Sequence, residues 1–535
     1  MTCISEWSVS LSYTRLSAGL QLLEPPPITP RRFNLLSFLA AAQALDITLL
    51  PITWEAARRD VGVGGTSRIN QSLANLHTSF AFKRIHDASK RQKTEREIFH
   101  NLTNEIRILS HKIVREHQSI AQLQGICWDI SPKDGKPWPV LVFEKSQFGD
   151  LYRFASLPVG REMSMSDSIG LCVDIGRAVV NMHASNIIHG DIKPENVLIF
   201  KELGRYSAKV TDFGYSAQYT NDDCWLRLPR SWPWNAPEHD RPARDWRPWQ
   251  AVKADIFSFG MLCFWLLFEP SLSKGTAPPQ GLHSATAERP SLAKDTLCEI
   301  KGKLQLHAQQ FIKAEVALDG NRREALGEFF DATLNSDPQK RETNLENLLR
   351  KLDPEQEICT KDSGVETNYL SCATDFEIQN SIHDFYYCDY RVRFYIAELL
   401  LTEYQYEPSL ALQLAFCYYI GFGLPCNEDK VSEILEQNKL DIRHIQEIMS
   451  QCIQIRHEYQ PATLGRLWDS GHIKRTDYRY TYLDQVKLEE AEEQLLQETK
   501  SLKNRFGKEH ELVQISLIMV TGIYSVRGQW SEVER

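Results

Sequence analysis

The sequence predicts an α+β fold of two lobes, followed by an all-α region. Strand-like runs dominate from about residue 46 to residue 145, and helical periodicity dominates from about residue 166 onward. Strands gathered in one part of a chain and helices in the next are typical of an α+β architecture. At roughly 150 residues per domain, 535 residues leave room for more than one domain.

Composition shifts divide the chain into four segments. Residues 1–44 form an N-terminal extension that contains the Pro-rich linker EPPPITP. Residues 45–352 form the two-lobed domain, and the polar, aperiodic residues 353–381 form a linker. Residues 382–535 form a helical module that we expect to fold apart from the domain before it.

Charge and cysteine content narrow the class of protein. The chain has 61 Lys and Arg against 70 Asp and Glu, a net charge of −9, so it lacks the basic footprint of a nucleic-acid binder. Twelve cysteines without a CxxC pair favour a reducing compartment over a zinc or disulfide framework. The N-terminus lacks the pattern of a secretory signal. We expect a cytoplasmic protein, with the nucleus left open as a second location.

The most apolar run, residues 256–268, is shorter than the ~20 residues that span a bilayer. We therefore interpret it as a buried helix and expect no membrane span.

The small lobe opens with a strand-like segment from Asp46 to Trp54. A Gly-rich turn, VGVGGTS, leads to a second strand-like run that ends in SFAFKRI. Apolar residues then recur at helical spacing from Ile98 to Ile113. Two further strand-like runs, QSIAQLQGICWDI and PVLVFEK, are separated by the turn SPKDGKP.

Glycines and a lysine in this lobe suggest a phosphate site. The turn glycines allow backbone N–H groups to approach phosphate oxygens, although a plain Gly-rich hairpin has the same pattern. Lys83 lies on a strand, where a buried lysine needs a partner. Glu105 on the next helix is the favoured partner, with Glu95 and Glu97 as alternatives. The interpretation without a functional role is that Lys83 and its partner form a solvent-exposed ion pair on the surface.

The strongest motif is HGDIKPENVLI, from His189 to Ile199. In it Asp191 can accept a proton from a hydroxyl, and Lys193 can neutralise a phosphoryl group. Asn196, and Asp212 sixteen residues later, offer the oxygen ligands that Mg²⁺ prefers. A base, a cation and two metal ligands are what phosphoryl transfer requires.

With these motifs in order, the chain resembles the eukaryotic protein kinase family, of the serine/threonine type, over about residues 47–352. The resemblance implies the two-lobed protein-kinase fold, with a small β-rich lobe and a large helical lobe, and it implies ATP and Mg²⁺ as cofactors. Among the site residues it implies, Asp191, Lys193 and Lys83 are catalytic, and Asn196 and Asp212 hold the metal. The cofactor-binding positions it implies are Gly62, Gly64, Ser67, Ile69, Ala81, Lys83, Glu105, Glu144 and Leu198.

Further positions bear on the large lobe and on regulation. The resemblance pairs Glu238 of Ala-Pro-Glu with Arg341, and Lys193-Pro-Glu-Asn is typical of the serine/threonine class. Gly190 replaces the arginine that normally precedes Asp191 and binds a phosphorylated loop, so HGD stands in place of HRD. We therefore expect activity without phosphorylation of the 212–238 loop.

The tail carries weaker signals of a repeat. Residues 411–435, with a Gly421-Phe422-Gly423 turn, resemble a tetratricopeptide-like helical hairpin. Glu490-Ala491-Glu492 recurs 42 residues later as Glu532-Val533-Glu534, a period that resembles the repeats of kinesin light chains. An ordinary helical bundle is the alternative. The sequence ends as a new unit begins, which suggests a truncated form of a longer array.

The sequence therefore predicts an ATP-dependent serine/threonine kinase that acts on protein hydroxyls. We expect a protein substrate at the kinase domain and a protein partner on the C-terminal repeats. The alternative is a pseudokinase or repeat-based scaffold that signals through protein interaction.

Overall fold

The computed structural model describes most of the chain. The described residues are 33–53, 60–63, 67–73, 79–85, 90, 93–131, 134–202, 204–219, 223–240, 245–272, 289–353, 376–454 and 485–526. They form two compact units. The sheet unit comprises the described residues within Arg32–Thr103, Leu123–Lys145 and Tyr369–Arg535, and the helical unit those within Asn104–Gln122 and Ser146–Asn368.

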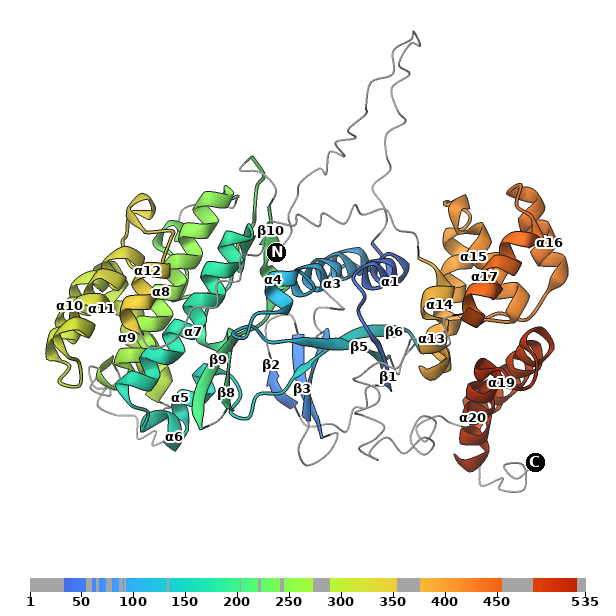
Figure 1. The fold of residues 1–535 in the computed structure, drawn as a ribbon, viewed down its shortest axis with the longest axis horizontal. Helices are drawn as coiled ribbons and strands as arrows, with labels where there is room; N and C mark the ends of the chain where they lie inside the picture. The colour runs from blue at the N-terminus through green and yellow to red at the C-terminus, as the bar shows by residue number, and fades with distance from the viewer. Residues whose placement is uncertain are drawn as a thin grey trace, which may run out of the picture. The chain divides into compact units, whose positions relative to one another are not determined.

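A six-stranded sheet in the order β1-β5-β6-β4-β3-β2 is the centre of the sheet unit (Figure 1). All neighbouring strands are antiparallel except β1 and β5, which run parallel. The strands are β1 (Leu49–Thr53), β2 (Asp60–Val63), β3 (Ser67–Leu73), β4 (Ser79–Ile85), β5 (Leu123–Ile130) and β6 (Pro137–Glu144).

Alternation along the strands builds the apolar core of this sheet. Leu50, Phe82, Cys127, Val140 and Val142 form one buried cluster, with Phe80 packed against it. Because side chains alternate along a strand, Ala81 and Lys83 lie on the opposite face of β4 from Phe82. The predicted strand-like segments lie in the predicted order, but the run that ends in SFAFKRI forms two strands, β3 and β4, and Gly62 and Val63 of the predicted turn belong to β2.

Two helices pack together beside the sheet: α1 (Leu35–Ala44) and α3 (Glu95–Leu109) (Figure 1). A capping box at Asn34 begins α1, and Phe38 of α1 contacts Phe99 of α3 with ring centroids 6.1 Å apart. Thr94 and Glu97 exchange hydrogen bonds at the start of α3. These bonds satisfy N–H groups that the first helical turn would otherwise leave unpaired.

The tail of the chain is helical, as predicted. Its helices are α13 (Ile382–Tyr387), α14 (Tyr390–Glu403), α15 (Ala411–Ile420), α16 (Glu428–Gln437), α17 (Ile442–Gln454), α19 (Gln485–Phe506) and α20 (Glu511–Val526). The predicted turn at Gly421-Phe422-Gly423 separates α15 from α16, and both glycines have positive φ. A Cβ at Gly423 would lie 2.4 Å from the Arg393 carbonyl oxygen, so only glycine fits there. Glu532-Val533-Glu534, the second copy of the proposed repeat, lies outside the described residues.

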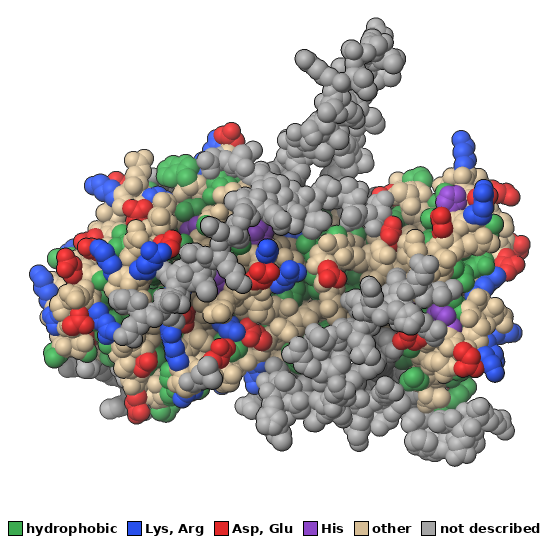
Figure 2. All heavy atoms as spheres, viewed as in Figure 1, with side chains coloured by type: hydrophobic (Ala, Val, Ile, Leu, Met, Phe, Trp, Pro, Cys, Tyr) green, Lys and Arg blue, Asp and Glu red, His purple; other side chains and the backbone are tan. Residues whose placement is uncertain are grey.

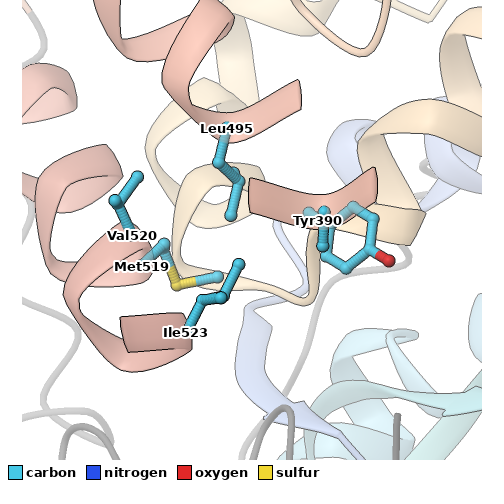
Figure 3. Packing of buried hydrophobic residues seen from close by; sticks show 6 residues of the cluster. Tyr390, Leu495, Met519, Val520 and Ile523 are labelled. Carbon is cyan, nitrogen blue, oxygen red and sulfur yellow. The ribbon is translucent and has the colours of Figure 1, made fainter. Parts of the chain in front are cut away.

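A buried cluster joins α14 to the α19–α20 hairpin. Figure 3 shows Tyr390 of α14 beside Leu495 of α19 and Met519, Val520 and Ile523 of α20. In addition, Arg393, which is fully buried, forms an ion pair with Glu498 of α19. The helix α14 is therefore fixed on one side by the rest of the tail.

The tail also packs against the sheet. Helix α13 contacts β1, and α14 contacts α1 and β6. Our expectation that residues 382–535 fold apart from the domain before them is contradicted by these contacts, because tail and sheet share one compact unit. Tertiary packing of this kind leaves no local signal in the sequence, and most of the predicted linker, residues 354–375, lies outside the described residues.

The helical unit holds the remaining elements. Its helices are α4 (Lys112–Arg115), α5 (Leu151–Ser156), α6 (Pro158–Arg161), α7 (Met165–Ala184), α8 (Pro248–Leu272), α9 (Arg289–Ile300), α10 (Leu304–Ala314), α11 (Gly320–Thr333) and α12 (Glu346–Leu352). Its strands form two ribbons, β7 (Ile187–Ile188) with β10 (Ala217–Gln218), and β8 (Val197–Glu202) with β9 (Arg205–Val210). The predicted fold class, with a small sheet lobe, a helical region and a helical tail, is confirmed.

The long apolar helix α8 is the core of the helical unit. It is the one helix among the described residues with the length and hydropathy of a membrane span, but 94% of its most apolar window is buried inside the protein. The predicted buried helix at residues 256–268 is thus confirmed. On the face shown in Figure 2, acidic and basic side chains are interspersed.

Candidate active site

The loop that follows β7 carries the HGD sequence, and a buried carboxylate anchors it. Asp255 of α8 accepts hydrogen bonds from the backbone N–H of His189 (2.8 Å) and of Gly190 (2.9 Å). Asp255 is 2% exposed. Gly190 has φ of +80°, a conformation that glycine adopts without strain. The backbone before Asp191 is therefore fixed by an acceptor on the core helix.

Asp191 is the centre of a compact polar cluster. One carboxylate oxygen, Oδ2, lies 2.6 Å from Lys193 Nζ and accepts a hydrogen bond from Asn196 Nδ2 at 3.1 Å. The other, Oδ1, accepts a hydrogen bond of 2.5 Å from the Ser231 hydroxyl. Asp191 is 4% exposed, so these groups take the place of water around its charge.

The protonation state of Lys193 follows from the same contacts. Burial lowers the pKa of Lys193, but the charge and hydrogen bond of Asp191, with the charges of Glu195 and Asp212, together raise it by more, so the net pKa lies above its ordinary value. Lys193 is therefore a permanent cation beside Asp191 at neutral pH.

A second oxygen-rich position lies at the end of the β8–β9 hairpin. Val197 pairs with Val210, and the Thr211 N–H donates to the Asn196 carbonyl oxygen at 2.9 Å. Asp212 follows in a left-handed conformation, with φ of 65°. The hairpin thus sets Asn196 and Asp212, which are sixteen residues apart, at the same end of the ribbon.

This position fits a hard cation. The Asn196 side-chain nitrogen donates to the backbone oxygen and the carboxylate of Asp191, at 2.8 and 3.1 Å. Among the described residues no hydrogen bond reaches Asn196 Oδ1, so that oxygen remains for a ligand. Amide and carboxylate oxygens are the donors that Mg²⁺ takes. Among the described residues, no group of three or more His, Cys, Asp and Glu side chains is placed to hold a metal ion, so the proposed metal position depends on the Asn–Asp pair.

The Asp-Phe-Gly segment packs against the catalytic loop. Phe213 is 1% exposed, and its ring lies 5.3 Å from the His189 ring. His189 accepts a hydrogen bond from Ser216 Oγ at its carbonyl oxygen, and its Nε2 lies 3.0 Å from the Thr211 carbonyl oxygen. Both ends of the Asp212 turn are therefore tied to the loop that carries Asp191.

The predicted partnership of Glu238 with Arg341 is present. The Arg341 guanidinium donates two hydrogen bonds to the Glu238 carboxylate, at 2.6 and 2.8 Å. Glu238 follows the segment that contains Ser231. A small hollow lies beside this segment. Asp191, Leu228, Ser231 and Trp234 are among the residues that line it.

Residues 56–352 match the protein kinase domain family, over more than half of the chain. The chain belongs to the protein kinase family. Curated relatives are distant: a probable serine/threonine-protein kinase roco6 of Dictyostelium discoideum is 28% identical over 41% of this chain and 10% of its own length. Serine/threonine-protein kinase Aurora-1 of Arabidopsis thaliana is 24% identical over 46% of this chain and 76% of its own length.

A relative named as a tyrosine kinase also matches. Tyrosine-protein kinase SPK-1 of Girardia tigrina is 27% identical over 33% of this chain and 32% of its own length. The matches thus span a tenth to about three quarters of these three relatives. Protein kinases use ATP and Mg²⁺ and act on protein substrates, which is the general activity that membership of the family implies.

The residues expected on the nucleotide side belong mostly to the sheet unit. In the antiparallel pairing of β2, β3, β4 and β6, Ile69 lies opposite both Gly62 and Lys83, and Ala81 lies opposite Phe143. The remaining expected positions are Ser67 at the start of β3, Glu144 at the end of β6, Leu198 on β8 of the helical unit, and Gly64, which lies outside the described residues.

The acid expected to pair with Lys83 is the buried one of three candidates on α3. Glu105 is 4% exposed. Glu97 instead binds the backbone N–H of Thr94, and Glu95 pairs with Lys136. These contacts favour Glu105, and its pairing with Lys83 stays a prediction.

Ser231 is a site residue that sequence reasoning missed. It lies in the 212–238 loop, and its hydroxyl donates a hydrogen bond to Asp191. A serine 40 residues after its partner forms no recognisable local pattern.

Proposed function

We propose that this chain is an active protein kinase that transfers the γ-phosphate of ATP to serine or threonine hydroxyls. The observation that carries the proposal is the cluster around Asp191, where Lys193, Asn196 and Ser231 all contact one buried carboxylate. A carboxylate held in this way has a fixed orientation and can accept a hydrogen bond from an incoming hydroxyl.

The roles that we assign follow from charge and position. Asp191 orients the substrate hydroxyl and receives its proton, and Lys193 offsets the negative charge that gathers on the transferred group. The Ser231 hydroxyl contacts Asp191 and lies 3.5 Å from Lys193 Nζ, so it keeps these two side chains in fixed positions relative to each other.

We assign Asn196 and Asp212 to the metal ion. When bound, Mg·ATP supplies the phosphoryl group and the metal neutralises its charge. We assign Lys83 of β4 to the α- and β-phosphates, with Glu105 of α3 as its partner. Gly62, Gly64, Ser67 and Ile69 would cover the phosphates, and Ala81, Glu144 and Leu198 would surround the adenine.

The preference for serine and threonine rests on the Lys193-Pro194-Glu195-Asn196 sequence. The names of relatives cover both hydroxyl classes, so the acceptor class needs a direct measurement. The alternative function is a scaffold that signals without catalysis. The joint presence of Lys83, Asp191, Asn196 and Asp212 favours the enzyme.

We also propose that the tail binds a protein partner through its helical hairpins, which would resemble tetratricopeptide-like repeats. Supporting observations are the α15–α16 and α19–α20 hairpins and the apolar side chains that α20 exposes, such as Leu517 at 42%. For the location of the protein we keep the cytoplasm as our proposal.

The test is phosphate transfer by the full-length chain with radiolabelled ATP and Mg²⁺, followed by identification of the phosphorylated amino acid. We expect Asp191→Asn to reduce turnover by roughly 10²- to 10⁴-fold while Mg·ATP binding, measured by calorimetry, stays near wild type. Asp212→Asn should weaken Mg·ATP binding and turnover together. A wild-type chain that neither binds Mg·ATP nor transfers phosphate would establish the scaffold instead.

A further inference from the structure

The first turn of α3 is held by a cluster that includes the tail. Glu95, in the first turn of α3, forms an ion pair with Lys136 of the turn between β5 and β6. Tyr395 of α14 donates a hydrogen bond from its hydroxyl to Glu95 Oε1 at 3.4 Å. These three residues are far apart in the sequence, so the contact exists only because the tail folds back onto the sheet.

Aromatic rings enclose the cation of this cluster. Lys136 Nζ lies 4.7 Å from the centroid of the Trp138 ring and 5.3 Å from that of Tyr395. Trp138 in turn stacks on Phe99 of α3, with centroids 5.7 Å apart and an interplanar angle of 12°. A lysine between two aromatic faces is attracted to both, and more strongly where water is excluded. Lys136 is 16% exposed at its side chain.

Titration of Tyr395 does not interfere with this arrangement. Burial raises the pKa of Tyr395, and the neighbouring charge of Glu95 raises it further. The charged groups around this phenol include Glu398 of α14 and Asp134 of the β5–β6 turn in addition to Glu95 and Lys136. The hydroxyl is therefore a donor throughout the neutral range.

Two more contacts bind the start of the tail to the same unit. The Trp128 indole N–H of β5 donates to Cys388 Sγ at 3.1 Å, in the turn between α13 and α14, where Cys388 is 1% exposed. Gln43 of α1 donates from Nε2 to the Glu377 carbonyl oxygen at 2.8 Å and to Ser381 Oγ at 3.0 Å. The tail is thus attached at three separate points rather than at one.

Helix α14 connects these attachments to the rest of the tail. Tyr395 donates a hydrogen bond to Glu95, and Arg393 of the same helix pairs with Glu498 of α19. Tyr390 of α14 packs against the α19–α20 hairpin (Figure 3). Both sets of contacts lie on one continuous helix of 14 residues. The tail therefore contacts α3, the continuous helix that also carries Glu105.

We propose that α14 is a positioning element for the kinase, with Tyr395 and Lys136 as the residues that hold the first turns of α3 in the arrangement required for phosphate transfer. The consequence for catalysis rests on the proposed function. The consequence for α3 itself does not, because order in a helix can be measured without turnover.

The experiment uses the full-length chain and compares Lys136→Met with Lys136→Arg, and Tyr395→Ala with Tyr395→Phe. Hydrogen exchange of the amides of residues 95–103 is measured beside kcat and the KM for ATP. We expect Lys136→Met and Tyr395→Ala to speed exchange in α3 about tenfold. We expect Lys136→Arg to stay near wild type, since it keeps the cation, and Tyr395→Phe to fall between.

A matched control is Tyr406→Ala, because Tyr406 follows α14 and is 66% exposed. It should alter neither exchange nor rate. In the same samples we expect Lys136→Met to reduce kcat/KM for ATP with the melting temperature nearly unchanged, and Lys136→Arg to restore it. If α3 exchanges at the wild-type rate in both Lys136→Met and Tyr395→Ala, the positioning role is wrong.

The outcomes separate the two proposals. Faster exchange in α3 with no phosphate transfer by the wild type would uphold the attachment of the tail but refute the catalytic function. Transfer that is unaffected by Lys136→Met, despite faster exchange, would show that α3 is held by α14 without consequence for catalysis, which overturns the positioning proposal. If Tyr395→Ala fails to fold, the two Lys136 variants still decide.

Discussion

Arg341 and Glu238 form a two-fold hydrogen-bonded ion pair inside the helical unit, with N–O distances of 2.6 and 2.8 Å. Arg341 is 1% exposed, and its other N–H groups donate to the carbonyl oxygens of Asn335 and Lys253. One guanidinium thus joins the segment after Ser231, the α8 helix and the chain after α11. The pairing was predicted by resemblance, and its full burial was not.

Removing this arginine should destabilise the helical unit severely. Arg341→Met would leave Glu238 buried without its partner, and breaking a buried pair in this way costs about 3–5 kcal/mol. The matched control is Arg350→Met, because Arg350 pairs with Glu346 on the surface of α12, where such a pair contributes about 0.5 kcal/mol or less. Urea unfolding of both variants measures the difference. Equal, small losses would contradict a structural role for the buried pair.

The hydroxyl of Ser231 should matter for rate and little for nucleotide affinity. Ser231→Ala removes the hydrogen bond to Asp191 Oδ1, and a hydrogen bond to a charged group is worth enough to lower kcat by roughly 10- to 100-fold. The KM for ATP should remain near wild type, because among the described residues the Ser231 hydroxyl contacts Asp191 and Lys193 of the catalytic loop and not the residues assigned to the nucleotide. Ser156→Ala, in which the lost hydroxyl bonds a carbonyl oxygen of α5, is the control and should leave kcat unchanged. A kcat of Ser231→Ala equal to that of the control would refute the assignment.

Activity should not depend on phosphorylation of the loop between Asp212 and Glu238. Gly190 offers no side chain to bind a phosphate, and its N–H already donates to Asp255. Bacterially produced protein treated with phosphatase should keep its rate. Tyr219→Phe combined with Thr220→Ala should change the rate less than about threefold, within the scale of surface substitutions. Thr220 lies outside the described residues. Ser231 is tested apart, because its contact with Asp191 would confound the result.

Stability should fall below neutral pH because of His117. Burial, and then the charge of Arg177, lowers the pKa of His117 to about 4 from 6.5. Its Nδ1 accepts a hydrogen bond from the Ser119 N–H at 3.0 Å, which a protonated ring cannot do. The unfolded chain takes up a proton between these two values and the folded chain does not. The contribution of neutral His117 to the free energy of unfolding is therefore fully present above pH 6.5. It decreases as the pH falls toward 4, by up to about 3 kcal/mol.

The check is the free energy of unfolding at pH 7, 5.5 and 4.5 for wild type and His117→Asn. Asparagine keeps an acceptor for Ser119 but does not titrate, so the difference between the two proteins should shrink with acidity. His444→Asn, at an exposed position of α17, serves as the control. A difference that stays constant across this range would rule out His117 as the source.

The kinase motifs show how much of the site the sequence could predict. Asp191, Lys193 and Asn196 lie within six residues, so the short loop between β7 and β8 is enough to bring them together. Local patterns also predicted β4, α3 and the buried helix α8, because strand alternation, helical periodicity and an apolar run are properties of neighbouring residues.

Contacts between distant segments were decided only by the tertiary structure. Nothing near Ser231 indicates that its hydroxyl lies on Asp191, and nothing near Tyr395 indicates that it reaches Glu95, 300 residues away. The polar stretch before residue 382 predicted a separate tail, yet α13 and α14 pack on the sheet. The sequence by itself determined the chemistry of the catalytic loop and the order of the elements, since both depend on spacing along the chain. The tertiary structure decided which surfaces of those elements meet. Side chains such as Cys388 and Trp128 are removed from water only when segments far apart in the sequence pack together, so their burial depends on the whole fold.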